Sequence, residues 1–278
     1  MNITPWESPV KKKLRAGLPV FGALIATGSV EAAAQTANLG FDFLWIEMEH
    51  SPITLETLRH MVLATRALPA LPFARVPVNE MWMAKRVLDA GVSGVIHPFT
   101  STPELARQAV AGCHYPPHGR RGSGADLARF GWPDGERYFD SADENVTVVA
   151  MVEEARAVEN IEEIAATPGL DVLFIGTSDL SFSLGLRNEQ DHPKLREAVD
   201  KVLDAARRHN KFVGRTAFDA HKVKGYLDQG FRFFTAPSEI AFIKAGVKQY
   251  FDVAGKPSAP TSAPSSAPPS NPTSEPRT

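Results

Sequence analysis

The sequence predicts an α/β fold, an eight-stranded (β/α)8 TIM barrel. Eight apolar runs of strand length alternate with amphipathic stretches as far as residue 252. Most of these runs, such as VTVVAMV and DVLFIG, are continuously apolar, which is typical of parallel strands covered on both faces. A barrel of this kind typically needs about 250 residues, and residues 1–256 precede a tail of different composition. Alternation, strand character and length therefore favour the same fold.

In chain order, the strands are expected at Val20 to Ile25, Phe41 to Glu47, Leu71 to Val76, Gly94 to His97, Thr147 to Glu153, Asp171 to Gly176, Phe212 to Thr216 and Phe231 to Ala236. Helical periodicity fills the intervals between them. Its clearest case places one apolar face on a single helix, formed by Leu195, Val199, Val202, Leu203 and Ala206. The open doubly wound sheet is disfavoured, because the segment after the first strand reads ATGSVEAAA and lacks the G-x-G-x-x-G turn of that fold.

The longest irregular stretch is expected between the fourth and fifth repeats, over residues 113–145. Loops of that length in compact domains are usually functional. The segment YPPHGRRGSG within it is rich in glycine and arginine. Two interpretations stay open: the loop cradles an anion, or it is a solvated crossing.

The two ends of the chain differ in character. Residues 1–254 are expected to form a single barrel domain, and residues 255–278 a disordered tail. From Pro257 onward the chain has no aromatic residue and no aliphatic side chain larger than alanine, too little to offset the entropy of ordering. At the other end, residues 11–29 resemble a signal peptide, but Pro19 and three glycines interrupt a run too short to span a membrane.

Charge and cysteine content narrow the class of protein. The chain has 30 Lys and Arg against 32 Asp and Glu, a formal net charge of −2, and a single cysteine. This balance argues against nucleic-acid or membrane-surface partners and favours a small-molecule ligand. One cysteine allows no internal disulfide, so a reducing, cytoplasmic location is expected.

Ionisable residues fall at the C-terminal ends of five predicted strands, where active sites of such barrels form. They are the segment Glu47-Met48-Glu49-His50, then Arg75, His97 and Glu153, and the segment Gly176-Thr177-Ser178-Asp179. Glu153 and Asp179 come from adjacent strands, which suits a shared divalent cation; an ion pair or a helix cap is the alternative. Arg75 either balances these carboxylates or donates to a substrate oxygen. His50 is a candidate base, with a structural role as the alternative.

Lysine placement argues against imine chemistry. A Schiff-base aldolase needs a lysine near the mouth of the barrel. Lys85 falls in a predicted helix and Lys211 at the entrance of the seventh strand, which is the opposite end.

Several segments carry a resemblance to a known family, in order and with near-family spacing over about residues 17–252: FDFLWIEMEHSPITLETLRHMVLATRA, PFARVPVNEMWMAKRVLDAGVSGVIHPFTSTPELARQAV, YPPHGRRGSG, VVAMVEEARAVENIEEIAATPGLDVLFIGTSDLSFSLG and HPKLREAV. The chain resembles the HpcH/HpaI aldolases, metal-dependent class II pyruvate aldolases with a barrel of the phosphoenolpyruvate/pyruvate-domain type. The resemblance implies a homo-oligomer, usually a hexamer built as a dimer of trimers.

By motif, the resemblance implies specific roles. Glu153 and Asp179 become ligands of Mg²⁺, Mn²⁺ or Co²⁺, and Arg75 the donor to the keto oxygen. His50 becomes the base, oriented by Asp89. The substrate is then a 4-hydroxy-2-keto acid, cleaved to pyruvate and an aldehyde, with Gly176, Thr177 and Ser178 as further contacts to the acid and the loop of Arg120 beside them.

Departures from the family pattern bear on the substrate more than on the reaction. Met151 stands where relatives often carry Gln, and Thr177 where they often carry Pro. The same chemistry also serves lyases acting on CoA thioesters and 2-keto acid decarboxylases, which are the alternatives within the enzyme class. A non-catalytic barrel that binds acidic metabolites is the alternative outside it.

Overall fold

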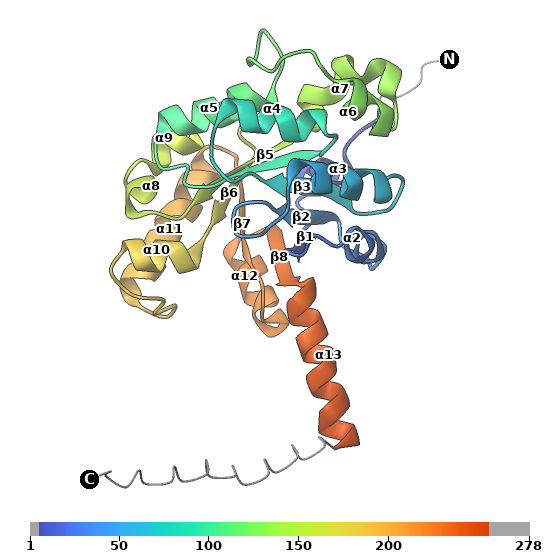
Figure 1. The fold of residues 1–278 in the computed structure, drawn as a ribbon. Helices are drawn as coiled ribbons and strands as arrows, with labels where there is room; N and C mark the ends of the chain where they lie inside the picture. The colour runs from blue at the N-terminus through green and yellow to red at the C-terminus, as the bar shows by residue number, and fades with distance from the viewer. Residues whose placement is uncertain (1–5, 256–278) are drawn as a thin grey trace, which may run out of the picture. The chain divides into compact units, whose positions relative to one another are not determined.

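The computed structural model describes residues 6–255. By internal packing the chain divides into two compact units at Phe242. In the first unit, eight parallel strands close into a barrel in the order of the sequence (Figure 1). The predicted (β/α)8 fold is confirmed.

The strands are β1 (Val20–Ile25), β2 (Phe43–Glu47), β3 (Leu71–Arg75), β4 (Gly94–His97), β5 (Thr147–Val152), β6 (Val172–Ile175), β7 (Phe212–Thr216) and β8 (Phe233–Ser238). Three of them have the predicted bounds, three differ by one or two residues at one end, and β6 and β8 differ by one or two residues at both ends. Because parallel neighbours pair all around the ring, from β1·β2 to β8·β1, no strand edge is left open.

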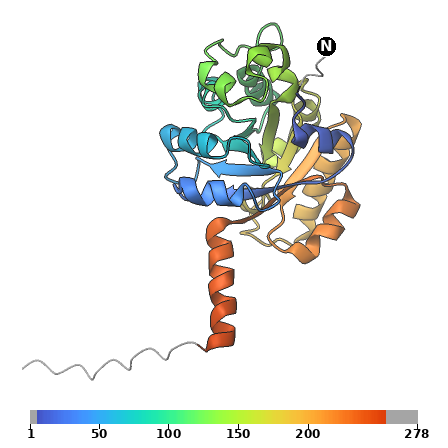
Figure 2. The same ribbon diagram turned by 90° about the vertical axis from the view of Figure 1, so that its right-hand side faces the viewer.

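The helices are α1 (Pro9–Arg15), α2 (Val30–Thr36), α3 (Leu55–Ala64), α4 (Met81–Asp89), α5 (Pro103–Cys113), α6 (Asp126–Gly131), η1 (Gly135–Arg137), α7 (Tyr138–Asn145), α8 (Ala155–Glu159), α9 (Ile161–Ala165), α10 (Thr177–Ser183), α11 (Pro193–Arg208), η2 (Ala220–Lys222), α12 (Val223–Gln229) and α13 (Glu239–Ala254). In the first unit they surround the strands (Figures 1 and 2). The predicted amphipathic helix is α11, which buries Leu195, Val202 and Leu203. α13 begins in the first unit and ends in the second.

Aromatic rings fill the inside of the barrel. Phe43 stacks on Phe233 at 4.5 Å between ring centroids and lies 4.9 Å from Phe73. Gly22 and Gly94 make room for these rings, because a Cβ at either position would lie within 2.5 Å of the ring of Phe43 or Phe73. The interior is thus a packed core and not a pore.

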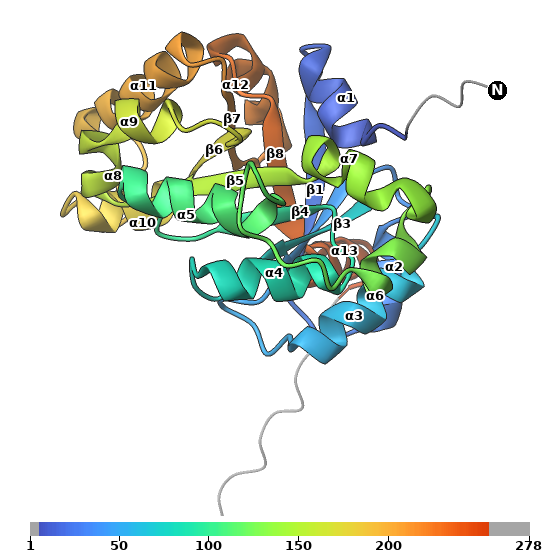
Figure 3. The ribbon, with the colours of Figure 1, turned by 90° about the horizontal axis from the view of Figure 1, so that it is seen from above.

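Helix α1 lies against the N-terminal ends of the strands (Figure 3). Val10 and Leu14 join the cluster of residues that fills the barrel. Lys11 Nζ donates to the carbonyl of Val146, just before β5, and pairs with Asp171, just before β6, at 3.0 Å. With this end covered, the C-terminal ends of the strands are the place for a ligand site.

The stretch expected to be irregular, residues 113–145, contains α6, η1 and α7, so that expectation was wrong for much of its length. These elements are short and polar, and they form because a few large side chains are buried. Trp132 contacts Trp6 and Tyr138 edge to face, with centroids 4.6 and 4.9 Å apart. Such distant packing has no periodic signal in the sequence.

The apolar run near the N-terminus forms strand β1. Among the described residues, no helix is long and apolar enough to cross a membrane. The predicted tail falls outside the described residues apart from Gly255, and the predicted domain boundary at residue 254 stays a prediction.

Candidate active site

A cavity of about 440 Å³ lies at the C-terminal ends of the strands. It is lined by side chains of strand ends and of the loops that follow them: Leu24, Trp45, Arg75, Met151, Phe174, Gly176, Thr177, Ser178, Asp179, Asn188, Gln190, Thr216, Phe218 and Thr235. The structure therefore brings together Arg75 and the predicted segment from Gly176 to Asp179.

Arg75, at the end of β3, is held by two carboxylates. Its Nε donates to Glu47 Oε2 at 2.6 Å, and its Nη1 lies 3.1 Å from Glu49 Oε2. Nη1 also lies 3.6 Å from the sulfur of Met151. These contacts fix the plane of the guanidinium group at the wall of the cavity.

Glu47 organises the turn that follows β2. Its Oε1 accepts hydrogen bonds from the backbone N–H groups of Glu49 and His50, at 2.7 and 3.0 Å. Its Oε2 also accepts from the indole N–H of Trp45 at 3.2 Å. From the sequence, Glu47 and Glu49 were expected only at a strand end, with no assigned role. Strand alternation points to one for Glu47, because Trp45 and Glu47 are two residues apart and share the inner face.

Glu153 is buried directly after β5, with 1% of its surface exposed. Its Oε1 accepts the backbone N–H of Phe99 at 2.7 Å. On its other side is Gly176, where a Cβ would lie 2.9 Å from Oε2 of Glu153. Burial, together with the negative charges of Glu49 and Asp179, raises the pKa of Glu153 to about 7, although Phe99 N–H and Arg75 act in the opposite direction.

The carboxylates at the mouth suit a hard divalent cation. Burial raises the pKa of Glu49, opposed by Arg75 and His50 and reinforced by Glu47 and Asp179. Glu49 Oε2 is buried and, although it lies 3.1 Å from Arg75 Nη1, it accepts no well-aligned hydrogen bond from the described residues. Within residues 6–255, no three acidic, His or Cys side chains are close enough to hold a metal ion by themselves. Glu153 does not itself line the cavity, but its pKa responds to the charge of Asp179. Two neighbouring carboxylates suit a site of the Mg²⁺ kind, in which one or two carboxylates bind and waters and substrate oxygens complete the octahedron.

His50 lies on the rim. Its side chain is 64% exposed, it is absent from the lining of the cavity, and its Nε2 is 3.7 Å from Glu49 Oε2. Glu49 Oε2 thus contacts both His50, the predicted base, and Arg75, the predicted donor.

The structure does not form the expected pair between His50 and Asp89. Asp89, at the end of α4, pairs instead with the fully buried side chain of Arg121, with 3.2 Å between Oδ1 and Nη2. Among the described residues, no hydrogen bond or ion pair joins it to His50. Arg121 belongs to the glycine- and arginine-rich loop, and its guanidinium lies 4.7 Å from the ring centre of Tyr115. This arginine is therefore internal, whereas Arg120 beside it is exposed.

Asn188 and Gln190 are among the lining residues to which the sequence did not point. Asn188 Oδ1 accepts a hydrogen bond from Gln190 Nε2 at 2.7 Å, and Gln190 Nε2 also lies 3.3 Å from the carbonyl of Thr177. Asn188 has a positive φ of 73°. Asn tolerates such a turn better than most residues, but nothing in a single sequence indicates that this turn folds over the mouth.

Comparisons with known proteins agree with the barrel fold. The model of a family described as HpcH/HpaI aldolase/citrate lyase matches residues 23–242. The chain is similar to a hydroxypyruvate/pyruvate aldolase of Paraburkholderia phytofirmans, at 32% identity over 89% of this chain and 97% of that protein. It is similar to a 5-keto-4-deoxy-D-glucarate aldolase of Salmonella arizonae, at 32% identity over 92% of this chain and all of that protein. A solved structure from Burkholderia cenocepacia, an HpcH/HpaI aldolase/citrate lyase family protein, superposes with a TM-score of 0.82 at 33% identity, covering 90% of this chain and all of that one.

Proposed function

This chain belongs to the HpcH/HpaI aldolase/citrate lyase family, and from that membership and the mouth of its barrel we propose that it catalyses reversible, metal-dependent aldol cleavage of a 4-hydroxy-2-keto acid. The products are pyruvate, or a close 2-keto acid, and an aldehyde. That the protein is a carbon–carbon lyase follows from its relatives, which are named aldolases and match this chain over 97% and 100% of their length.

The observation that carries the proposal is the arrangement of charges around Arg75. A fixed guanidinium group, held by Glu47 and Glu49, lines the same cavity as Asp179. The charges of Arg75, Glu49 and Asp179 all shift the pKa of Glu153, so its carboxylate lies near them. A 2-keto acid needs this combination: a cation site for its two neighbouring oxygens and a forked donor for the charge that develops on one of them.

In the mechanism, Glu153 and Asp179 would hold a divalent cation, which when bound supplies Lewis acidity toward the keto oxygen. Arg75 donates hydrogen bonds to that oxygen and, because its position is set by Glu47 and Glu49, needs little reorganisation as negative charge develops. His50 accepts the proton of the C4 hydroxyl in cleavage and returns it in condensation. Gly176 lets the chain pass close to Glu153, and Thr177 and Ser178 offer polar contacts to the carboxylate of the acid.

The substrate class rests on the relatives, two of which are named for pyruvate and keto-sugar-acid aldol chemistry. The family description also includes citrate lyase. A related lyase acting on a CoA thioester is therefore the second candidate. Such an enzyme would not be required to exchange the methyl protons of free pyruvate with solvent.

We further propose that the protein works in the cytoplasm as a homo-oligomer, a hexamer built as a dimer of trimers. The single cysteine and the balanced charge support the location. The resemblance supports the assembly, and the unformed pair between His50 and Asp89 is compatible with a site completed by another copy of the chain.

The decisive experiment follows the methyl protons of pyruvate by NMR in D2O with Mg²⁺ or Mn²⁺. Exchange that requires both protein and metal is the expected result, because it reports proton removal at C3 without an aldehyde. Folded protein that gives no metal-dependent exchange would remove the aldolase proposal, and turnover of a CoA thioester in its place would establish the second candidate.

Two variants test the assigned roles. Asp179→Asn should lose metal-dependent exchange, and His50→Ala should keep metal binding while cleavage slows by roughly a hundredfold, within the range of general acid–base catalysis. Asp228→Asn, which changes an exposed carboxylate on α12, is the matched control. Full turnover in either site variant contradicts its role.

A further inference from the structure

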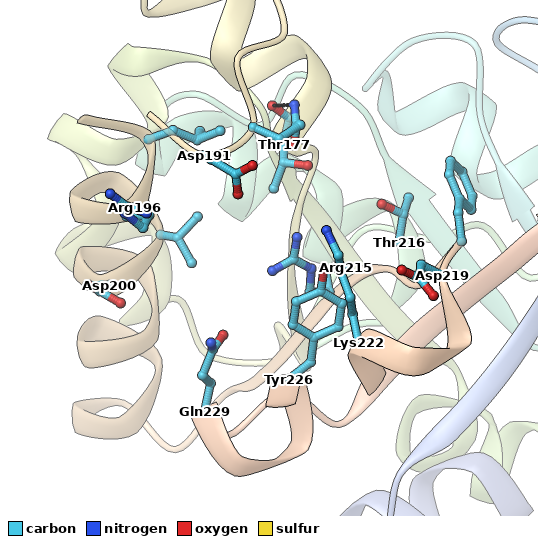
Figure 4. Close-up of a pocket in the computed structure, with 14 residues that line it drawn as sticks. Thr177, Asp191, Arg196, Asp200, Arg215, Thr216, Asp219, Lys222, Tyr226 and Gln229 are labelled. Atoms are coloured by element: carbon cyan, nitrogen blue, oxygen red, sulfur yellow. Dashed lines mark hydrogen bonds between the residues drawn. The ribbon is translucent and has the colours of Figure 1, made fainter. Parts of the chain in front are cut away.

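A second cavity, of about 550 Å³, lies beside the catalytic one, between α11, the end of β7 and the segment from η2 to α12 (Figure 4). Four residues line both cavities: Thr177, Gln190, Thr216 and Phe218. The second cavity therefore adjoins the catalytic mouth across a shared wall.

Arg215 is the unusual residue of this cavity. Its neighbours on β7 face the barrel: a Cβ at Gly214 would lie 2.7 Å from the ring of Phe174, and Thr216 lines the catalytic cavity. Arg215 therefore points outward, toward α11 and α12. That interface is normally apolar, yet here it carries a guanidinium group, which lies 3.7 Å from the ring centre of Tyr226 and 5.2 Å from that of Phe231.

The two rings fix Arg215 without neutralising it. In the described part of the chain it makes no ion pair and no hydrogen bond, and its Nε is buried without a partner. Burial lowers its pKa, and Tyr226 is the group that opposes this effect. A positioned cation removed from water without an anion is costly, and an anionic ligand would offset that cost.

Two further cations line the same space. Lys222 comes from η2 and Arg196 from α11 (Figure 4), and neither forms an ion pair with another described residue. The carboxylates of Asp191, Asp200 and Asp219 also line the cavity, but none pairs with these three cations. A compact anion that reaches Arg215 is therefore favoured over a large polyanion, which would meet the three aspartates.

We propose that this second cavity binds a carboxylate or phosphate group, with Arg215 as the forked donor and Lys222 and Arg196 as supporting charges. Arginine matches the geometry of both oxyanions with two parallel hydrogen bonds. The anion has two possible sources: the far end of a substrate whose reacting carbons lie in the catalytic cavity, or a separate small anion. Only the first source rests on the proposed aldolase function.

Calorimetric titration of the full-length protein with inorganic phosphate and with succinate tests the site itself. Wild type should bind at least one of them, and Arg215→Gln should weaken binding roughly tenfold or more, as expected for loss of charge-assisted hydrogen bonds. Lys222→Gln should weaken it less. Arg215→Lys, which keeps the charge but loses the fork, should fall between wild type and Arg215→Gln.

The matched control is Lys224→Gln, which removes an exposed charge from α12 outside the lining of the cavity. The proposal is overturned if wild type binds neither anion, or if Arg215→Gln and Lys222→Gln bind like Lys224→Gln. If Arg215→Gln does not fold, judged by circular dichroism, Lys222→Gln and Arg196→Gln decide the matter, because both replace exposed side chains.

Kinetics separate the two sources. If the substrate supplies the anion, the KM for succinic semialdehyde, measured with pyruvate as donor, should rise about tenfold in Arg215→Gln. The KM for butanal, which lacks the carboxylate, should then stay constant. A KM unchanged for both acceptors, with phosphate binding lost, indicates a separate anion. Protein that shows no pyruvate exchange but binds phosphate through Arg215 would overturn the proposed function and leave this site standing.

Discussion

At the scale of single residues, the mouth of the barrel holds more carboxylate than its arginine balances. Arg75 pairs with Glu47 and Glu49, whereas Glu153 and Asp179 form no ion pair with another described residue. The pKa of Glu153 is raised to about 7, mainly by burial and further by the charges of Glu49 and Asp179. A carboxyl group that prefers its proton in the folded chain makes stability depend on pH.

The direction of this dependence follows from the two pKa values of Glu153. In the unfolded chain the group titrates near 4.5, and in the folded chain near 7. As pH rises through this window, the unfolded state loses its proton first, so the metal-free protein loses stability between about pH 4.5 and 7. Glu153→Gln removes this loss and should be more stable than wild type at pH 8 by up to about 3 kcal/mol, with a much smaller difference at pH 4.5.

Urea denaturation at both pH values, in the presence of a chelator, measures this difference. Glu159→Gln, which changes an exposed carboxylate on α8, should keep the wild-type pH profile. Added Mg²⁺ or Mn²⁺ should restore stability at pH 8 to wild type and not to Glu153→Gln, because a ligand of the folded state stabilises it by mass action. Parallel pH profiles for wild type and Glu153→Gln would contradict the assignment.

Gly176 offers a second test at this scale. Its φ is −80°, so alanine meets no backbone strain there, but a Cβ would lie 2.9 Å from both Cβ and Oε2 of Glu153. Gly176→Ala should displace the carboxylate and lower kcat by about a hundredfold, as expected for a misplacement near 1 Å, while the protein stays folded. At Gly225 on α12 a Cβ meets nothing within 4 Å, so Gly225→Ala should leave turnover unchanged. Equal kinetics of the two variants would show that the close approach has no catalytic importance.

At the scale of elements, alternation along each strand links the core to the site. On β2, Phe43 and Trp45 fill the barrel and Glu47 follows on the same face; on β3, Phe73 is followed by Arg75. The pairing of β2 with β3 sets Glu47 beside Arg75. The positions of the catalytic groups therefore depend on the packing of the rings below them.

Gly94, the first residue of β4, tests how tightly these rings pack. A Cβ at this position would lie 2.5 Å from the ring of Phe73. Gly94→Ala should destabilise the protein by roughly 1–3 kcal/mol through overpacking, measured by urea denaturation. The double variant Gly94→Ala with Phe73→Leu should recover part of this loss relative to the sum of the single changes, because the smaller side chain gives the methyl group space. Strict additivity would show that the ring is not the obstacle.

At the scale of the whole molecule, what the sequence could predict was local or periodic. Strand order, the amphipathic face of α11 and the strand-end positions of Arg75 and Asp179 follow from alternation and chain order alone. The contacts that join distant segments do not: the pairing of Asp89 with Arg121, the turn of Asn188 over the mouth, and the outward Arg215 beside Tyr226 all depend on three-dimensional packing. Helices α6 and α7 belong with them, since buried aromatic contacts define them.

The end of the chain supplies the last test. Residues 257–278 lack any aromatic or large aliphatic side chain, so a chain ending at Gly255 should keep the melting temperature, turnover and assembly of the full chain.

A chain ending at Phe242 should lose this assembly, because it lacks most of α13. Residues Ile243, Val247 and Tyr250 of that helix share one face. A helix of this length is marginal alone, and in the proposed homo-oligomer we expect it to pack against another copy of the chain. Light scattering after size exclusion should show hexamers for the full chain and for the chain ending at Gly255, and smaller species for the chain ending at Phe242. An unchanged mass in the shortest chain would contradict a role of α13 in assembly, and a monomeric full chain would contradict the hexamer itself.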